Sequence, residues 1–99
     1  MVLKALSFGP RHGYAVARWI AAVTGDVLSV EEGSLYPALH RLEERGAIES
    51  EWGTSENNRR ARYYKVSAKG RQRLKAETAS WERFAQAVAR VLAAPEPAV

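Results

Sequence analysis

The chain has 99 residues, 46% of them hydrophobic, and no cysteine, so it has the size of one domain and excludes both a disulfide framework and a thiolate metal site. It contains no apolar run of 18 residues and opens with no secretory signal, which excludes a membrane-spanning helix and predicts a cytoplasmic protein. The net charge of +4 is uneven, because residues 1–58 hold five basic and eight acidic residues, whereas residues 59–75 hold eight basic residues and no acidic one.

The first quarter of the chain predicts two helices. Residues 2–8 are apolar and are followed by the breaker cluster GPRHG. A second apolar set then recurs at the helical spacing i, i+3, i+4, i+7, and Gly25 is placed to end that helix. The members of this set are Val16, Trp19, Ile20 and Val23. His12 is interpreted as a structural or exposed loop residue.

A third helix is predicted around GSLYPALHRLEERG, residues 33–46. Its buried stripe consists of Leu35, Leu39 and Leu42, and Gly46 ends it. Its start is ambiguous, because Ser29 and Glu32 spell a capping box whereas Pro37 cannot donate a backbone hydrogen bond in a continuous helix. The helix therefore begins near Ser34 or is kinked at Pro37.

The outer side of the third helix carries groups that suit DNA. Hydroxyl, imidazole and guanidinium groups reach phosphates or base edges, and arginine is best suited to guanine. A solvated face is the alternative interpretation. The candidate contacts are Ser34, Tyr36, Pro37, His40 and Arg41. The carboxylates of Glu43 and Glu44 repel phosphate, so we expect them to face away or to restrain an arginine.

A hairpin follows the third helix. Residues 48–52 alternate as a strand does, residues 61–66 are rich in aromatic residues and read as the return strand, and the segment between them is turn-forming. Asn57 and Asn58 are expected to shape the turn, since asparagine tolerates left-handed geometry. The basic residues read as phosphate or minor-groove contacts, with a plain exposed loop as the alternative. They are Arg59, Arg60, Arg62 and, as a supporting charge, Lys65.

The last helix is predicted from Ser67, its N-cap, to about residue 94. Leu74, Trp81 and Val88 repeat every seven residues, and Ala85 and Leu92 fill the alternate heptad position, so with Phe84 the helix carries a seam like that of a coiled coil. A homodimer is therefore expected. A helix lying on a membrane surface over residues 68–94 is a weaker interpretation, because its polar side holds both signs of charge.

Three helices, a two-stranded hairpin and a long helix, in this order, predict a mainly α (α+β) winged helix-turn-helix. We expect a DNA-binding domain over residues 1–66, a dimerisation helix over residues 67–94 and a disordered tail over residues 95–99. The sequence resembles the PadR-like transcriptional regulators. The matching pieces are HGY at 12–14, EEGSLYPALHRLEERGAIES at 31–50, Trp52, RRARYYKVSAKG at 59–70 and Trp81.

This resemblance implies the short form of the family, with a single C-terminal helix. Members are dimeric repressors of inverted-repeat operators, with half-sites of the ATGT/ACAT type. It also implies that Tyr14 is a core residue, and that Trp81 and its symmetry mate either anchor the dimer or stack a planar aromatic effector. The family's first helix usually begins several residues earlier, so the first helix here is expected to be short, with a weaker dimer or a misassigned start.

No catalytic arrangement is recognisable, so an enzyme is not expected. The two histidines, His12 and His40, have no zinc spacing, and neither a cofactor nor a metal is expected. The alternative to DNA binding is a winged-helix module that binds a protein partner, and the basic segment at residues 59–75 argues against it.

Overall fold

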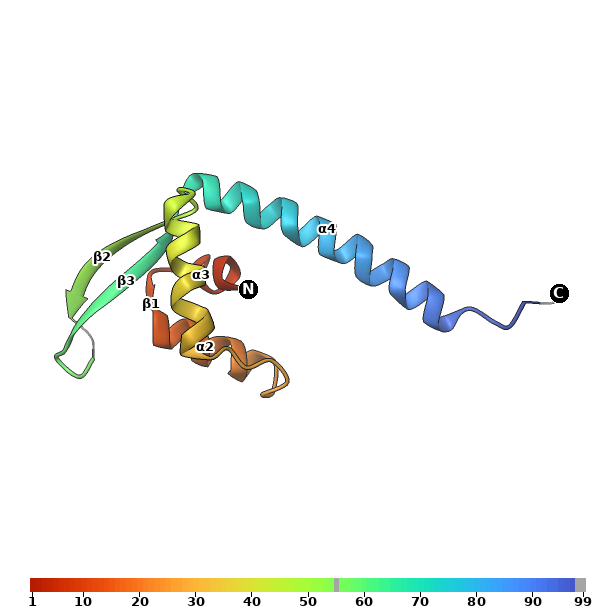
Figure 1. The fold of residues 1–99 in the computed structure, drawn as a ribbon, viewed down its shortest axis with the longest axis horizontal. Coiled ribbons are helices and arrows are strands. Elements are labelled where there is room, and N and C mark those ends of the chain that lie inside the picture. The colour runs from red at the N-terminus through yellow and green to blue at the C-terminus, as the bar shows by residue number, and fades with distance from the viewer. Residues whose placement is uncertain (55, 98–99) are drawn as a thin grey trace.

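The computed structural model describes residues 1–54 and 56–97 and has the expected winged-helix order. Helices α1 to α3 pack together beside a small sheet, and α4 projects away from them (Figure 1). The elements are α1 (Val2–Leu6), β1 (Arg11–His12), α2 (Gly13–Val23), α3 (Glu32–Glu44), β2 (Ile48–Thr54), β3 (Arg60–Val66) and α4 (Ala68–Ala93). The predicted mainly α fold is confirmed. Of the expected tail, residues 98–99 lie outside the described residues.

One core joins the first three helices to the base of the hairpin. Each helix contributes the apolar residues of one face, and the strands contribute only the residues nearest the helices, because the hairpin extends beyond them (Figure 1). The large buried side chains are Leu3, Leu6, Val16, Ile20, Leu35, Leu39, Ile48, Tyr64 and Val66.

The predicted glycine stops of α2 and α3 are confirmed. Gly25 and Gly46 have φ angles of 57° and 74°, the left-handed conformation that glycine adopts without strain. After Gly46, the N–H of Ala47 donates to the carbonyl of Leu42 at 2.9 Å, which satisfies one of the free carbonyls at the end of α3. The chain therefore turns sharply from α3 into β2.

The start of α3 resolves the ambiguity around Pro37. The helix has Glu31 as its N-cap, without a side-chain hydrogen bond, so Ser29 is not the N-cap. The side chain of Glu32, the other member of the possible capping box, lies outside the described part of the structure. The helix begins before Ser34 and continues through Pro37, which removes the hydrogen bond that residue 37 would donate to the carbonyl of Gly33. Packing of the leucine stripe holds the helix together across this missing bond.

The sheet has one strand more than the two-stranded wing that was predicted. In the described residues its order is β1-β3-β2, with Arg11 opposite Tyr64 and His12 opposite Tyr63. β1 has only two residues and lies in the breaker cluster, so no alternation marks it. Its formation depends on a neighbour some fifty residues away in sequence. The two hairpin strands run two residues further than expected for β2, to Thr54, and one further for β3, from Arg60.

Three expectations for the first two helices are wrong. α1 ends at Leu6, not at residue 8, with Ser7 as its C-cap. Val23 is 63% exposed, and Tyr14 is 54% exposed and so is not a core residue. The buried face of α2 runs through Gly13, Val16 and Ile20, at i, i+3 and i+7, which turns Tyr14 toward solvent.

Close contacts attach the start of α4 to the end of α3. The predicted cap is confirmed, because the Ser67 hydroxyl accepts from the N–H of Gly70 at 3.1 Å, and it also donates to the carbonyl of Gly46 at 2.5 Å. A Cβ at Gly70 would lie 2.0 Å from the carbonyl oxygen of Ala47, so only glycine allows this approach. The direction in which α4 leaves the domain is thus set where α3 ends.

Candidate nucleic-acid interface

The two sides of α3 have opposite surroundings. Leu35 and Leu39 are 0% exposed, and Leu42 packs partly buried against the same core, as predicted. The residues on the other side are exposed to solvent, and they are the predicted contacts Ser34, Tyr36, Pro37, His40 and Arg41. α3 is therefore anchored by its leucines and presents a hydrogen-bonding surface outward.

This outward surface spreads over two flanks of the helix. Tyr36 lies on the flank toward the wing, where it lines a groove with Trp52 and Arg60. Arg41 lies on the flank toward α1 and α4, where it lines a shallow groove with Met1 and Arg73. The structure thus brings Tyr36, and not Arg41, together with the wing arginines.

Close contact with α2 sets the position of Tyr36. A Cβ at Gly13 would lie 3.0 Å from Cε1 of the Tyr36 ring, so the absence of a side chain at residue 13 lets this ring lie against the start of α2. The Nδ1 atom of His12 caps the same helix by accepting from the N–H of Ala15 at 3.2 Å. The expected structural role of His12 is confirmed, and Gly13 of the HGY segment lies against the Tyr36 ring of α3.

His40 lies on the outermost part of α3. Its Nε2 is 2.8 Å from Oε1 of Glu44, one helical turn later, and both side chains are more than 60% exposed. Exposed pairs of this kind contribute little, so His40 is free to exchange this partner for another hydrogen-bonding group.

Alternation along β3 divides the wing's basic residues between two faces. Arg60 and Arg62 share the face that continues into the core through Tyr64, whereas Lys65 lies on the opposite face and pairs with Glu49 at 3.6 Å. The Arg60 guanidinium carbon is 4.7 Å from the centre of the Trp52 ring. Arg59 is exposed at the turn, next to Asn58, whose φ of 57° confirms the predicted left-handed geometry.

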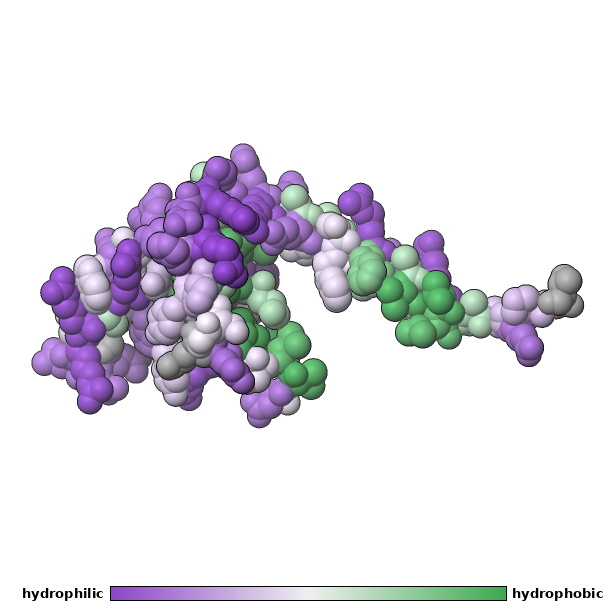
Figure 2. Space-filling model, in the orientation of Figure 1, coloured by the Kyte–Doolittle hydropathy of each residue, from purple (hydrophilic) through white to green (hydrophobic). Residues whose placement is uncertain are grey.

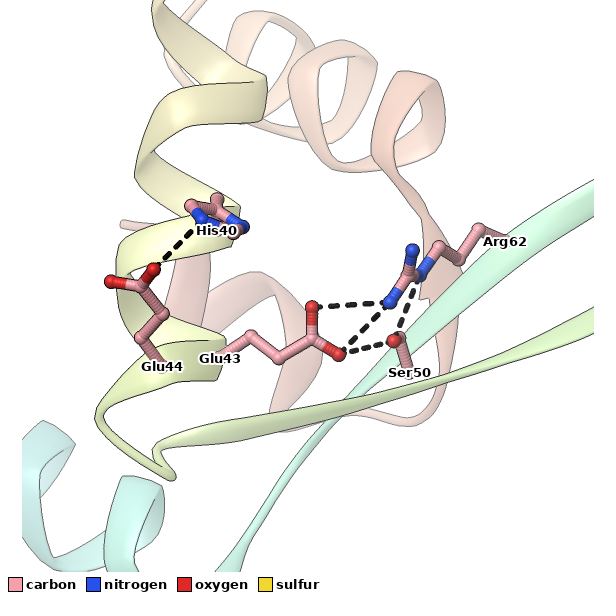
Figure 3. A network of polar contacts seen from close by, with 5 residues as sticks. All are labelled: His40, Glu43, Glu44, Ser50 and Arg62. Carbon is pink, nitrogen blue, oxygen red and sulfur yellow. Dashed lines mark hydrogen bonds and ion pairs between the residues drawn. The ribbon is translucent and has the colours of Figure 1, made fainter.

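Arg62 differs from Arg60, which lies over an aromatic ring, because its guanidinium hydrogen-bonds to a hydroxyl and pairs with a carboxylate. Its Nε donates to Oγ of Ser50 at 2.8 Å, and its Nη2 lies 3.2 Å from Oε2 of Glu43 (Figure 3). The Ser50 hydroxyl in turn donates to the Glu43 carboxylate. That hydroxyl, together with the charge of Arg62, lowers the pKa of Glu43. The expectation that Glu43 restrains an arginine is confirmed.

The groove between α3, the start of α2 and the wing has a volume of about 450 Å³. Its walls combine aromatic rings with cationic groups, and Tyr64 at its base has a pKa raised by burial. Of the lining residues, only Tyr36, Arg60 and Arg62 were predicted as part of the site, and the aromatic residues Tyr14 and Trp52 are among those that were missed. Trp52 could have been found from the hairpin register, because it lies directly opposite Arg62.

The predicted effector and dimer residues lie along α4. Leu74 packs against the core and Ala85 is partly buried, but Trp81 is 65% exposed and Leu92 is 80% exposed, with Phe84 and Val88 also exposed. The Trp81 and Phe84 ring centres are 5.6 Å apart. Figure 2 shows the hydrophobic surface continuing along one side of α4 toward its C-terminal end.

The described residues contain no group of three or more potential metal ligands among His, Asp and Glu. None of the helices formed by residues 1–54 and 56–97 combines the length and the apolar character needed to cross a membrane.

Comparison with known proteins agrees with this geometry. The family model described as "Transcriptional regulator PadR-like family" matches residues 2–76. An uncharacterised protein of a Streptomyces fradiae transposon is 38% identical over 84 residues, which are 85% of this chain and 23% of that protein, so the chain spans about a quarter of it. An uncharacterised Lysinibacillus sphaericus protein is 25% identical over 82% of this chain and 74% of its own length.

Solved structures of transcriptional regulators share the fold over most of both chains. One from Clostridium thermocellum is 29% identical with a TM-score of 0.81, covering 90% of this chain and 86% of that one. A PadR-like regulator from Bacillus cereus is 26% identical with a TM-score of 0.81, covering 95% and 89%. With its winged-helix fold, its exposed recognition helix and a family match over three quarters of its length, this chain belongs to the PadR-like family of DNA-binding transcriptional regulators.

Proposed function

We propose that this chain is a homodimeric repressor that places its two α3 helices in the major groove of an inverted-repeat operator and rests its wings on the flanking phosphates. The observation that carries the proposal is the two-sidedness of α3: Leu35 and Leu39 are fully buried on one side, whereas Tyr36 on the outward side lines the same groove as Arg60. A merely solvated face of α3 would not require aromatic and cationic groups from three elements around it.

The side chains divide into base-reading and phosphate-binding groups. Tyr36, Pro37, His40 and Arg41 project from the exposed surface of α3 and suit base edges in the major groove. Ser34, in the first turn of α3, suits a phosphate through its side-chain hydroxyl, because the residue is exposed there. Arg59 and Arg60 suit phosphates at the wing, and Lys65 supports them from the outer face.

Dimerisation follows from the apolar side of α4. Trp81, Phe84 and Leu92 are exposed in the single chain, and a coiled-coil-like pairing of two α4 helices would bury them. A two-fold dimer presents its two recognition helices to half-sites about one DNA turn apart, which predicts an inverted repeat.

The same seam supplies a place for an effector. Trp81 and Phe84 form a tilted aromatic pair on the exposed side of α4, and two copies of this pair would face each other across the dimer axis. We propose that a planar aromatic compound stacks between them and releases the repressor from DNA. Proflavine is a suitable probe when its binding is measured on the protein alone by its own fluorescence, because it also intercalates into duplex DNA. It should bind the wild type and not Trp81→Leu, and equal binding to both would contradict this site.

Selection of binding sites from random duplex DNA tests the proposal, followed by affinity measurements on the selected duplex as a function of salt. About three phosphate contacts per subunit neutralise about six phosphates per dimer, so the log–log salt slope should be near −5. Selection of an inverted repeat with a steep slope supports the proposal. Failure to select any sequence, with a slope near zero, would instead favour a winged-helix module that binds a protein partner.

A further inference from the structure

A polar bridge connects the end of the recognition helix to the middle of the wing. Glu43 lies in the last turn of α3, Ser50 on β2 and Arg62 on β3, and their side chains meet in the space between these elements (Figure 3). All three side chains bond to one another: Arg62 to Ser50 at 2.8 Å, Arg62 to Glu43 at 3.2 Å, and Ser50 to Glu43. The bridge therefore connects α3, β2 and β3 to one another through side-chain hydrogen bonds and an ion pair.

The bridge also changes what Arg62 can do. Its positive charge is balanced by the Glu43 carboxylate, and phosphate approaching that carboxylate would be repelled. Arg60, two residues along the same face of β3, is held over the uncharged ring of Trp52 and keeps its full positive charge. Two arginines on one face of one strand thus differ in electrostatic character.

Much of the hairpin lies outside the core, so the bridge can affect the position of the wing tip. Only the base of the hairpin is buried in the core, through Ile48, Tyr64 and Val66, and the rest extends beyond the helices. Seven residues of strand span about 23 Å, so a tilt of about 10° at the base would move the tip by about 4 Å. A hydrogen bond to phosphate tolerates only a few tenths of an ångström, so the wing needs a fixed angle to α3.

We propose that Glu43 and Ser50 are positioning residues that use Arg62 as a strut to hold the wing at a fixed angle to the recognition helix, and that Arg62 is not a phosphate ligand. The inference rests on the proposed DNA-binding function. The phosphate contacts of the wing then lie at its tip. The side chains of Glu43, Ser50 and Arg62, which need not touch DNA, set the position of these contacts relative to the bases that α3 contacts.

The first test compares DNA affinity and salt slope for Glu43→Gln, Arg62→Met and Arg60→Ala on the selected operator. Arg60→Ala should flatten the slope by about one unit per subunit. Arg62→Met should weaken binding by about 10-fold without changing the slope. Glu43→Gln should also weaken binding by about 10-fold, although it removes a negative charge. The matched control is Glu51→Gln, which removes the same charge from the opposite face of β2.

A phosphate-binding Arg62 would give the opposite pattern. Arg62→Met would then flatten the slope as Arg60→Ala does, and Glu43→Gln would bind DNA more tightly because it frees the arginine. Either result overturns the strut. The proposed function fails separately, if the wild-type protein shows no salt-dependent binding at all.

A second test needs no DNA. The chain has no cysteine, so a pair of spin labels can be introduced at Arg45 and Asn57, near the end of α3 and in the wing turn. Diluting labelled chains with unlabelled protein isolates the distance within one chain. The distance distribution should be narrow in the labelled parent and at least twice as broad after Glu43→Gln or Arg62→Met. Equal widths in the parent and both variants, with unchanged melting, would contradict the proposal.

Discussion

Helices α3 and α4 carry apolar stripes of the same kind, but their environments differ completely. The leucines of α3 are 0% exposed at Leu35 and Leu39, because α1, α2 and the base of the sheet cover them. The stripe of α4 packs on the core at Leu74, where the helix leaves the domain, and its large side chains are exposed from Trp81 onward. An amphipathic pattern therefore predicts that one face of a helix is covered. The fold determines whether another part of the same chain covers it or leaves it for a second copy.

The most severe way to test this difference is to truncate one leucine of α3. Leu39→Ala opens a cavity in a core that has no solvent access and should destabilise the domain by about 2–5 kcal/mol. Leu92→Ala, the same change on the exposed part of α4, should leave the fold of each chain intact. Thermal melts followed by circular dichroism at one fixed protein concentration distinguish them, and equal losses would mean that α4 is part of the same core.

Polar substitutions in the α4 seam should break the dimer while sparing the winged domain. Changing Trp81 and Val88 together to serine removes apolar surface that the two α4 helices would bury against each other. The free energy of dimerisation should weaken by about 3 kcal/mol, so the dissociation constant should rise about 100-fold. Sedimentation equilibrium at micromolar concentration measures this. A wild-type chain that sediments as a monomer there would show that α4 does not find its partner through this seam.

The exposed side of α3 should govern sequence preference and not stability. His40→Ala and Arg41→Ala should each weaken operator binding by about 1–3 kcal/mol and relax the preference at one base position. Their melting temperatures should match the wild type, because neither residue is buried. Site selection with each variant provides the measurement, and recovery of the wild-type site at equal affinity would exclude this face from base reading.

The smallest expected effect lies in the bridge between α3 and the wing. The Ser50 hydroxyl and, secondarily, Arg62 depress the pKa of Glu43 in the folded chain. A depressed carboxylate pKa stabilises the fold at neutral pH, and that stability is lost as pH falls from the ordinary value near 4.5 through the depressed one. The contribution should be below about 1 kcal/mol, since the pair is partly exposed.

Urea melts of wild type and Glu43→Gln between about pH 6 and about pH 3 check this sign. The wild type should lose more stability than the variant over that range, and Glu51→Gln should behave as the wild type does. A variant that loses as much stability on acidification as the wild type would show that the Glu43 carboxylate contributes nothing to the pH dependence.

Local chemistry in the sequence was sufficient to predict the order of elements, the glycine stops of α2 and α3, the Ser67 cap, the leucine stripe of α3 and the outward position of His40. Each of these depends on residues within about one or two turns of each other, where helical or strand periodicity decides which side chains share a face. The same periodicity predicted the apolar seam of α4, since the spacing of seven is independent of what covers it.

Only the tertiary structure decided the features that join distant segments. β1 exists because its two residues pair with β3, Tyr14 is exposed because Gly13 and Val16 turn the other side of α2 inward, and Arg62 is bonded to Glu43 because the hairpin folds back beside α3. The sequence predicted that Glu43 would face away or restrain an arginine, but it did not show that Arg62, nineteen positions away, is that arginine. Charge is a property of a residue, whereas the partner that neutralises it is set by the path of the chain.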